Sequence, residues 1–463
     1  MSQKPDFRAF EDWRVDDLAW VQLGFYDQDT KLTVAQKKVV EKNAKLLLDR
    51  DKWSAHVQAF EEQLALIKNE EERSQTRARY QIRFDHHTFP DHKANFFGFH
   101  FPCSVSFSGA TFGKGSVMFS RATFGDGTVS FSGTTFGERV VRFHGAIFGD
   151  GDVWFSGAKF GKGGGSFYGV TFGDGDVWFV GAKFNGGGVS FKDATFGDGN
   201  VLFDNIKLIE TPVSFEDTKV AGNFFVRDIT FPKGANFQRA SVKGTADFSG
   251  NTFHEVPDFR DTVFARPPEV ARMEVVPYAF TFMTPWWKGE SDEAAKYRKL
   301  KAMALAANDH EKDGEFFAYE MLAKRGHEKG SKSRFALFIN WLYFTLSNFG
   351  QSYWRPFLWM VFSFFSFFVI YALNAAPFLK PSELSTFARW HSLSNTVPFL
   401  GSLSRFAPSP NDHKTSFDLA FNKIADKDGP VDLLITLGIF QNFFGHILLF
   451  LLLLGLRNKF RLK

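Results

Sequence analysis

A phenylalanine recurs every 12 residues along the middle of the chain, from Phe107 to Phe203, and a second set from Phe112 to Phe196 keeps the same period. The gaps between successive phenylalanines therefore alternate between five and seven residues. In a flat strand an odd gap places consecutive side chains on opposite faces. In an α-helix a step of 12 residues rotates the side chain by roughly 120°, so no apolar stripe forms. The chain must turn a corner between one phenylalanine and the next, and we predict a solenoid with every phenylalanine pointing inward.

The residues around each phenylalanine support this prediction. A small or β-branched residue stands two positions earlier, as Val105 does before Phe107 and Ala110 before Phe112. Positions i−2 and i share a face of a strand, so both side chains point into the coil. Glycine follows the second phenylalanine of most repeats, and glycine readily takes the positive φ that a tight corner needs.

A period of 24 residues lies within the shorter one, because every second corner reads Gly-Asp-Gly. We predict about seven coils of 24 residues, stacked about 4.8 Å apart. The aspartates should then lie above one another as an acidic ladder. One interpretation is that aspartate is simply favoured in tight turns. The other is that the ladder binds cations or a basic partner. The ladder consists of Asp126, Asp150, Asp174 and Asp198.

The stretch from about Phe89 to Phe264 resembles the pentapeptide-repeat family. The resemblance implies a right-handed quadrilateral β-helix with a small residue at i−2 and Leu or Phe at the centre of each face. The sequence departs from the family's ten-residue half-turn by two extra residues at alternate corners. Such a fold does not by itself indicate an activity.

Two apolar segments near the C-terminal end reach the roughly 20 residues that a helix needs to cross a bilayer. They are Phe357–Ala376 and Leu433–Leu456, and neither contains Asp, Glu, Lys or Arg. Basic residues precede the first and follow the second, so the positive-inside rule places both termini in the cytoplasm and 380–430 outside. We expect an integral protein of a bacterial inner membrane. The shorter, aromatic Phe335–Phe349 is expected to lie along the cytoplasmic leaflet.

Ser347–Ser352 with Arg355-Pro356, and the closing Leu456–Lys463, resemble membrane-anchored pentapeptide-repeat proteins whose C-terminal part is ion-channel-like. The potassium-filter sequence Thr-Val-Gly-Tyr-Gly is absent. The expected external loop offers another segment, Asn395–Gly401, in its place. Its candidate residues are Asn395, Thr396, Pro398 and Gly401.

Polar residues and glycines interrupt the second apolar segment. Polar side chains in membrane helices are costly and usually face a bundle interior or an aqueous path, and glycines let helices approach closely. We expect these residues to line a pore in a homo-oligomer. The alternative is that they form hydrogen bonds between packed helices. The candidates are Asn442, His446, Gln441, Gly438 and Gly445.

The sequence predicts a multidomain chain. Its parts are an N-terminal helical region (1–84), the β-helix (85–265), a linker (266–290), a cytoplasmic helical hairpin (291–329), an interfacial helix with a junction (330–355) and a two-span membrane domain (356–463).

Motifs for catalysis or cofactor binding are absent from the sequence: there is no Walker loop, nucleophile motif or HExxH helix. We therefore expect neither an enzyme nor a cofactor. Asp85-His86-His87, Asp91-His92 and His100 fit no standard zinc spacing and are interpreted as capping or surface residues, so no metal site is expected. The Gly-Asp-Gly corners are like calcium-binding β-roll turns, but the period of 12 differs from that family's nine.

The charge and the cysteine content limit the kinds of partner that the chain can have. The net charge is +4, and the single cysteine, Cys103, suits a reducing compartment. Between 105 and 265 there are 17 acidic and 15 basic side chains, a net charge of −2, which is too little for a mimic of DNA. We expect a lipid bilayer, further copies of the chain and an unidentified cytoplasmic protein or ligand as partners, and no nucleic acid. The predicted function is a solenoid that acts as sensor or binding module for an oligomeric, channel-like pore; the alternative is a membrane-tethered interaction scaffold without transport activity.

Overall fold

The computed structural model describes residues 6–14, 32–91, 94–276, 292–325, 327, 333–397, 416–427 and 429–460. The chain forms two compact units. The first consists of Met1–Phe280 with Lys299–Asp309, and the second of Thr281–Arg298 with His310–Lys463.

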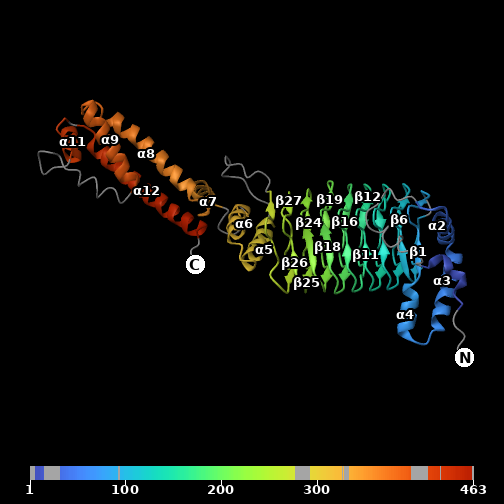
Figure 1. Ribbon diagram of the computed structural model, residues 1–463. Helices are drawn as coiled ribbons and strands as arrows, with labels where there is room; N and C mark the ends of the chain where they lie inside the picture. The colour runs from blue at the N-terminus through green and yellow to red at the C-terminus, as the bar shows by residue number, and fades with distance from the viewer. Residues whose placement is uncertain are drawn as a thin grey trace. The chain divides into compact units, whose positions relative to one another are not determined.

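The first unit contains a β-solenoid of about eight turns (Figure 1). Each coil supplies short parallel strands to four sides, and strands of successive coils pair with one another. The first side is one sheet of β1 (Gln81–Arg83), β4 (Ser104–Ser106), β8 (Val129–Ser130), β11 (Val153–Trp154), β14 (Val177–Trp178), β18 (Val201–Asp204), β22 (Phe224–Arg227) and β26 (Ala246–Asp247). The second side holds β2 (Thr88–Phe89), β5 (Thr111–Phe112), β12 (Lys159–Phe160), β15 (Lys183–Phe184), β19 (Lys207–Leu208), β23 (Thr230–Phe231), β27 (Thr252–Phe253) and β29 (Glu274–Val275).

The two remaining sides are built in the same way. The third side is one sheet of β6 (Val117–Met118), β9 (Val141–Arg142), β13 (Gly164–Ser166), β16 (Gly188–Ser190), β20 (Val213–Ser214) and β24 (Ala235–Asn236). The fourth side holds β3 (His100–Phe101), β7 (Thr123–Phe124), β10 (Ile147–Phe148), β17 (Thr195–Phe196), β21 (Lys219–Val220), β25 (Ser241–Val242) and β28 (Val263–Phe264).

Strand register confirms the 24-residue coil in the middle of the solenoid, where Val129 pairs with Val153 and Val153 with Val177. Later coils are shorter, because Val201 pairs with Phe224, 23 residues on, and Phe224 with Ala246, 22 residues on. The sequence suggested about seven coils. The structure has about eight because the solenoid already begins in β1 and extends to β29.

The inward register of the phenylalanines is also confirmed, since no member of the two sets is more than 2% exposed. Rings of successive coils stack in columns. The Phe155 ring lies between those of Phe131 and Phe179, with centroid separations of 4.9 and 4.7 Å. Each ring is thereby buried against its counterparts in the coils on either side.

N-terminal helices pack on the beginning of the solenoid (Figure 1). They are η1 (Arg8–Trp13), α2 (Val34–Leu47), α3 (Arg50–Ala65) and α4 (Glu70–Ala78). The fully buried Trp53 of α3 donates from Nε1 to the carbonyl of His100 in β3, at 3.0 Å. Covering the first coil in this way hides strand edges that would otherwise pair with other chains.

The second unit is helical. Helix α5 (Glu293–Ala306) contributes residues to both units, and the others are α6 (His310–Ala323), α7 (Arg334–Ser347), α8 (Trp354–Ala375), α9 (Pro381–Thr396), α11 (Ser416–Ala425) and α12 (Val431–Lys459). Helices α8 and α12 are long and apolar enough to cross a membrane. Large apolar side chains such as Phe362, Phe443 and Phe450 are exposed on them, which is unlike the core helices of a water-soluble protein.

Candidate functional site

Helix α9 runs back along α8 and α12 and ends near their middle. Its beginning lies beside the end of α8, where Phe387 and Ala388 pack with Tyr371 and Ala375. Further along α9, the hydroxyl of Ser392 donates to the carbonyl of Phe364, in the middle of α8, at 2.6 Å. The helix is therefore antiparallel to α8 and covers only half of its length.

This arrangement differs from the expected external loop over 380–430, because that segment contains α9 and α11 and α9 packs along both long helices. Pro381 at the first helical position is a start signal in the sequence. The rest of α9 mixes polar and apolar residues, and two of its buried polar residues, Ser392 and Thr396, form hydrogen bonds with remote helices. That part of the arrangement could not be read from a local pattern.

Gln441 of α12 joins three helices. Its side chain is fully buried and accepts a hydrogen bond from the hydroxyl of Tyr371 at 2.8 Å. Its amide nitrogen lies 3.0 Å from the carbonyl of Ser392 and 2.7 Å from the Thr396 hydroxyl. The structure places Gln441 in the contact of α8, α9 and α12, as the interhelical alternative anticipated.

Gly438 and Gly445 lie in the same contact. A Cβ at Gly445 would come within 2.5 Å of the Thr396 carbonyl oxygen, and one at Gly438 within 3.1 Å of the Asn395 side-chain nitrogen. Both glycines are buried. Their role in this structure is to let α9 approach α12 closely.

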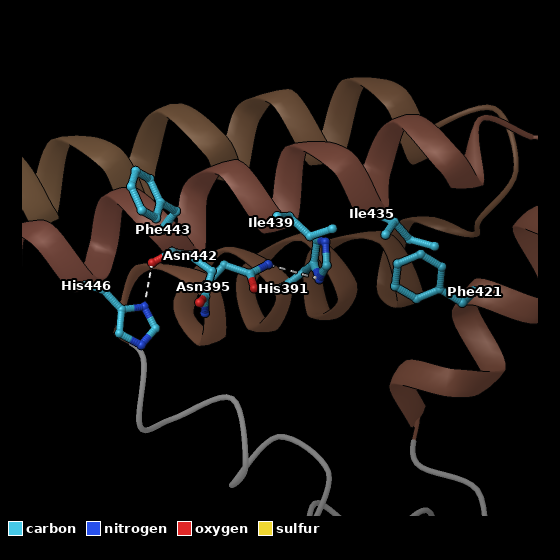
Figure 2. A pocket seen from close by; sticks show the side chains of 9 residues that line it. His391, Asn395, Phe421, Ile435, Ile439, Asn442, Phe443 and His446 are labelled. Carbon is cyan, nitrogen blue, oxygen red and sulfur yellow. Dashed lines mark hydrogen bonds between the residues drawn. The ribbon is translucent and has the colours of Figure 1, made fainter.

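Asn442 and His446 instead line an open hollow of about 630 Å³ (Figure 2). His446 is exposed, and its Nδ1 lies 2.8 Å from the carbonyl of Asn442. A carbonyl only accepts, so Nδ1 is the donor in this hydrogen bond. His391 and Asn395 of α9 line the same hollow, with 3.5 Å between the Asn395 amide nitrogen and His391 Nδ1.

The hollow thus brings together some of the residues singled out from the sequence and separates others. Asn395, Asn442 and His446 line it together, and Gly438 lines it as well as lying in the contact with α9. Thr396 is buried against Gln441. Pro398 and Gly401 lie outside the described residues. His391 was missed, because a single histidine in an expected loop carries no periodic signal.

The aspartates of the acidic ladder lie in a line, and carboxylates of the ladder accept hydrogen bonds from backbone N–H groups of the next coil. Oδ1 of Asp150 accepts from the backbone N–H of Asp174 at 3.2 Å, and Oδ1 of Asp174 from that of Asp198 at 3.1 Å. Oδ1 of Asp126 faces the next coil at Gly149. These contacts are those expected of turn chemistry.

A second ladder, missed in the sequence, runs beside the first. Oδ1 of Asp152 accepts from the backbone N–H of Asp176 at 2.9 Å, and Oδ1 of Asp176 from that of Asn200 at 2.6 Å. The Asn223 amide continues the column by donating to Asn200 Oδ1 at 2.9 Å. The same 24-residue spacing could have revealed it, because Asp152 and Asp176 are as far apart as their neighbours in the first ladder.

Asp85, at the entry to the solenoid, is buried beside Arg83 and accepts a hydrogen bond from the Ser106 hydroxyl. Burial raises the pKa of this carboxyl to about 6. In the described part of the chain, no group of three or more His, Cys, Asp or Glu side chains is placed to hold a metal ion. His92 of the histidine-rich segment lies outside that part.

Comparisons with known protein families and with curated proteins found no match to this chain.

Proposed function

We propose that the chain is a membrane protein in which a cytoplasmic pentapeptide-repeat solenoid acts as sensor or binding module for an oligomeric, ion-channel-like pore. Helices α8 and α12 would be the two spans of each subunit. Their exposed phenylalanines would face lipid, and the hollow beside α9 would face the path of the ion.

The observation that carries this proposal is the end of α9 beside the middle of α12, where Thr396 accepts a hydrogen bond from Gln441. If α8 and α12 cross the bilayer, α9 ends near its midplane. The last four carbonyls of a helix have no partner within the helix. Irregular backbone is tolerated at that depth only where protein buries it or where it lines a water-filled cavity. Thr396 is buried against Gln441, but the neighbouring Asn395 lines the open hollow. A short helix that enters from one side and ends halfway beside such a hollow supports a pore.

The polar groups around the hollow give the pore a chemical character. The C-terminal end of a helix carries partial negative charge, and Thr396 is the last residue of α9. The amide side chains of Asn395 and Asn442 line the hollow nearby. These groups favour a cation over an anion.

Single-channel recording from the purified chain in planar bilayers tests the function directly. Cysteine substitution sharpens this test, because the native Cys103 is fully buried and should not react. Asn442→Cys should be modified by a charged, water-soluble thiol reagent, and the modification should reduce the current. Phe450→Cys, on the exposed face of the same helix, is the matched control and should be inert if it faces lipid.

Two results would contradict the pore. One is the absence of ion flux from correctly assembled protein at any pH or voltage. The other is equal labelling of the Asn442→Cys and Phe450→Cys proteins without effect on the current. Either result would favour the membrane-tethered interaction scaffold.

A further inference from the structure

Two arginines lie against the ring of Phe344 on α7. The guanidinium of Arg325, just beyond α6, is 5.4 Å from the ring centroid, and that of Arg355, in the first turn of α8, is 5.0 Å from it. Arg325 Nε also donates to the side-chain oxygen of Asn340 at 2.5 Å, and Arg355 Nη1 to the carbonyl of Phe344 at 2.9 Å. The two positive charges are thus held near one aromatic ring by neutral partners.

Within the described part of the chain, neither arginine forms an ion pair with a carboxylate. Arg325 is only 4% exposed, and its Nη2 has no hydrogen-bond partner among the described residues. Burial lowers the pKa of its guanidinium to about 10. A buried charge without a counter-charge is costly, and natural proteins normally pair it. An anion bound beside the pair would offset this cost.

The unpartnered nitrogen of Arg325 sets the chemistry of a ligand. A guanidinium can only donate hydrogen bonds, so its Nη2 needs an acceptor. A phosphate group offers several acceptor oxygens together with negative charge, and arginine binds it through charge-assisted hydrogen bonds.

We infer that Arg325 and Arg355 bind a phosphate group beside α7, at the start of α8. Two sources share this chemistry: the headgroup of an anionic phospholipid and free phosphate. The lipid source rests on the proposed function, because it needs α8 to begin at the cytoplasmic membrane surface, where anionic headgroups attract basic residues. Arg355 is partly exposed, so a ligand at the surface can reach its guanidinium.

The test uses the full chain in neutral detergent and measures its melting temperature with three additions: phosphatidylglycerol, phosphatidylcholine and inorganic phosphate. A ligand that binds only the folded state raises the melting temperature. We expect phosphatidylglycerol to raise it by about 3 °C or more and phosphatidylcholine to leave it unchanged. A rise with inorganic phosphate alone would assign the site to free phosphate.

Arg355→Gln should remove at least half of the rise, and Arg325→Gln should remove it entirely. The matched control is Arg334→Gln, an exposed arginine at the start of the same helix α7, which should keep the full rise. If Arg325→Gln fails to fold, Arg355→Lys replaces it: the lysine retains the charge but not the planar fork, and should weaken the response.

Equal responses of wild type, Arg355→Gln and Arg334→Gln would overturn the site, as would no response of wild type to any phosphate compound. Failure of the pore proposal is a separate outcome. If the chain responds to phosphatidylglycerol through Arg355 but conducts no ions, the result supports the phosphate site and contradicts the pore.

Discussion

At the residue scale, the solenoid depends on side chains that repeat at one spacing. Each interior phenylalanine stacks on its counterparts one coil before and one coil after, as Phe155 does on Phe131 and Phe179. Edge-to-face contacts add to these stacks, since the ring of Phe143 lies 5.6 Å from that of Phe155 at an interplanar angle of 89°. Truncating one ring therefore removes contacts in three coils.

Phe155→Ala should destabilise the first unit by about 3–5 kcal/mol, because it removes buried apolar area and leaves a cavity. Lys183→Ala changes an exposed side chain on β15 and should alter stability by less than about 0.5 kcal/mol. Thermal unfolding of the two full-length variants, followed by circular dichroism, makes the comparison. Equal melting temperatures would contradict the inward register.

Asp85 should make stability depend on pH. Its folded pKa of about 6 lies above the ordinary value of 3.8, so between these values the folded state retains a proton that the unfolded state releases. Stability should therefore fall as pH rises from about 4 to 6, by on the order of 2–3 kcal/mol. Asp85→Asn should flatten this part of the profile, whereas Asp51→Asn, on an exposed residue, should not. An unchanged Asp85→Asn profile would assign the pH dependence to other groups.

At the element scale, the sequence predicted those elements that a repeated or continuous local pattern specifies. The phenylalanine period specified the solenoid, and long runs without Asp, Glu, Lys or Arg indicated α8 and α12. Helix α9 escaped prediction because its place depends on remote partners, Phe364 on one helix and Gln441 on another. Gln441 shows the same limit: a polar residue in an apolar helix can face water or another helix, and the sequence does not distinguish the two.

The close packing of α9 against α12 can be tested by substituting two glycines of α12. Gly445→Ala would push a methyl group toward backbone, 2.5 Å from the Thr396 carbonyl oxygen, and should cost about 1–3 kcal/mol by overpacking. Gly438→Ala meets mainly the ends of side chains, at 3.1 Å or more, and should cost less. Melting temperatures of the solubilised variants, with conductance as a second readout, compare them. A larger loss of stability from Gly438→Ala than from Gly445→Ala would contradict this packing of α9 against α12.

At the scale of the whole molecule, the number of membrane crossings decides where each segment lies. Helix α9 has 16 residues, about 24 Å of helix, against roughly 30 Å of hydrocarbon. It ends beside the middle of α8 and is therefore not counted as a crossing in the proposed topology. If α8 and α12 are the two crossings, as we propose, both ends of the chain lie on one side.

The proposed topology therefore predicts that a reporter fused after Lys463 reads cytoplasmic and that one inserted near Ser409 reads external. The basic end of α12, with Arg457 and Lys459 in its last turn, gives the direction, because positive charge is retained in the cytoplasm. A cytoplasmic reading at both sites would mean that α9 and the residues after it do not return to the outer surface. An external reading after Lys463 with a cytoplasmic one near Ser409 would mean that the charge bias is overridden or that α7 also crosses. The reporter enzymes need no ion flux, so this result stands whether or not the pore conducts.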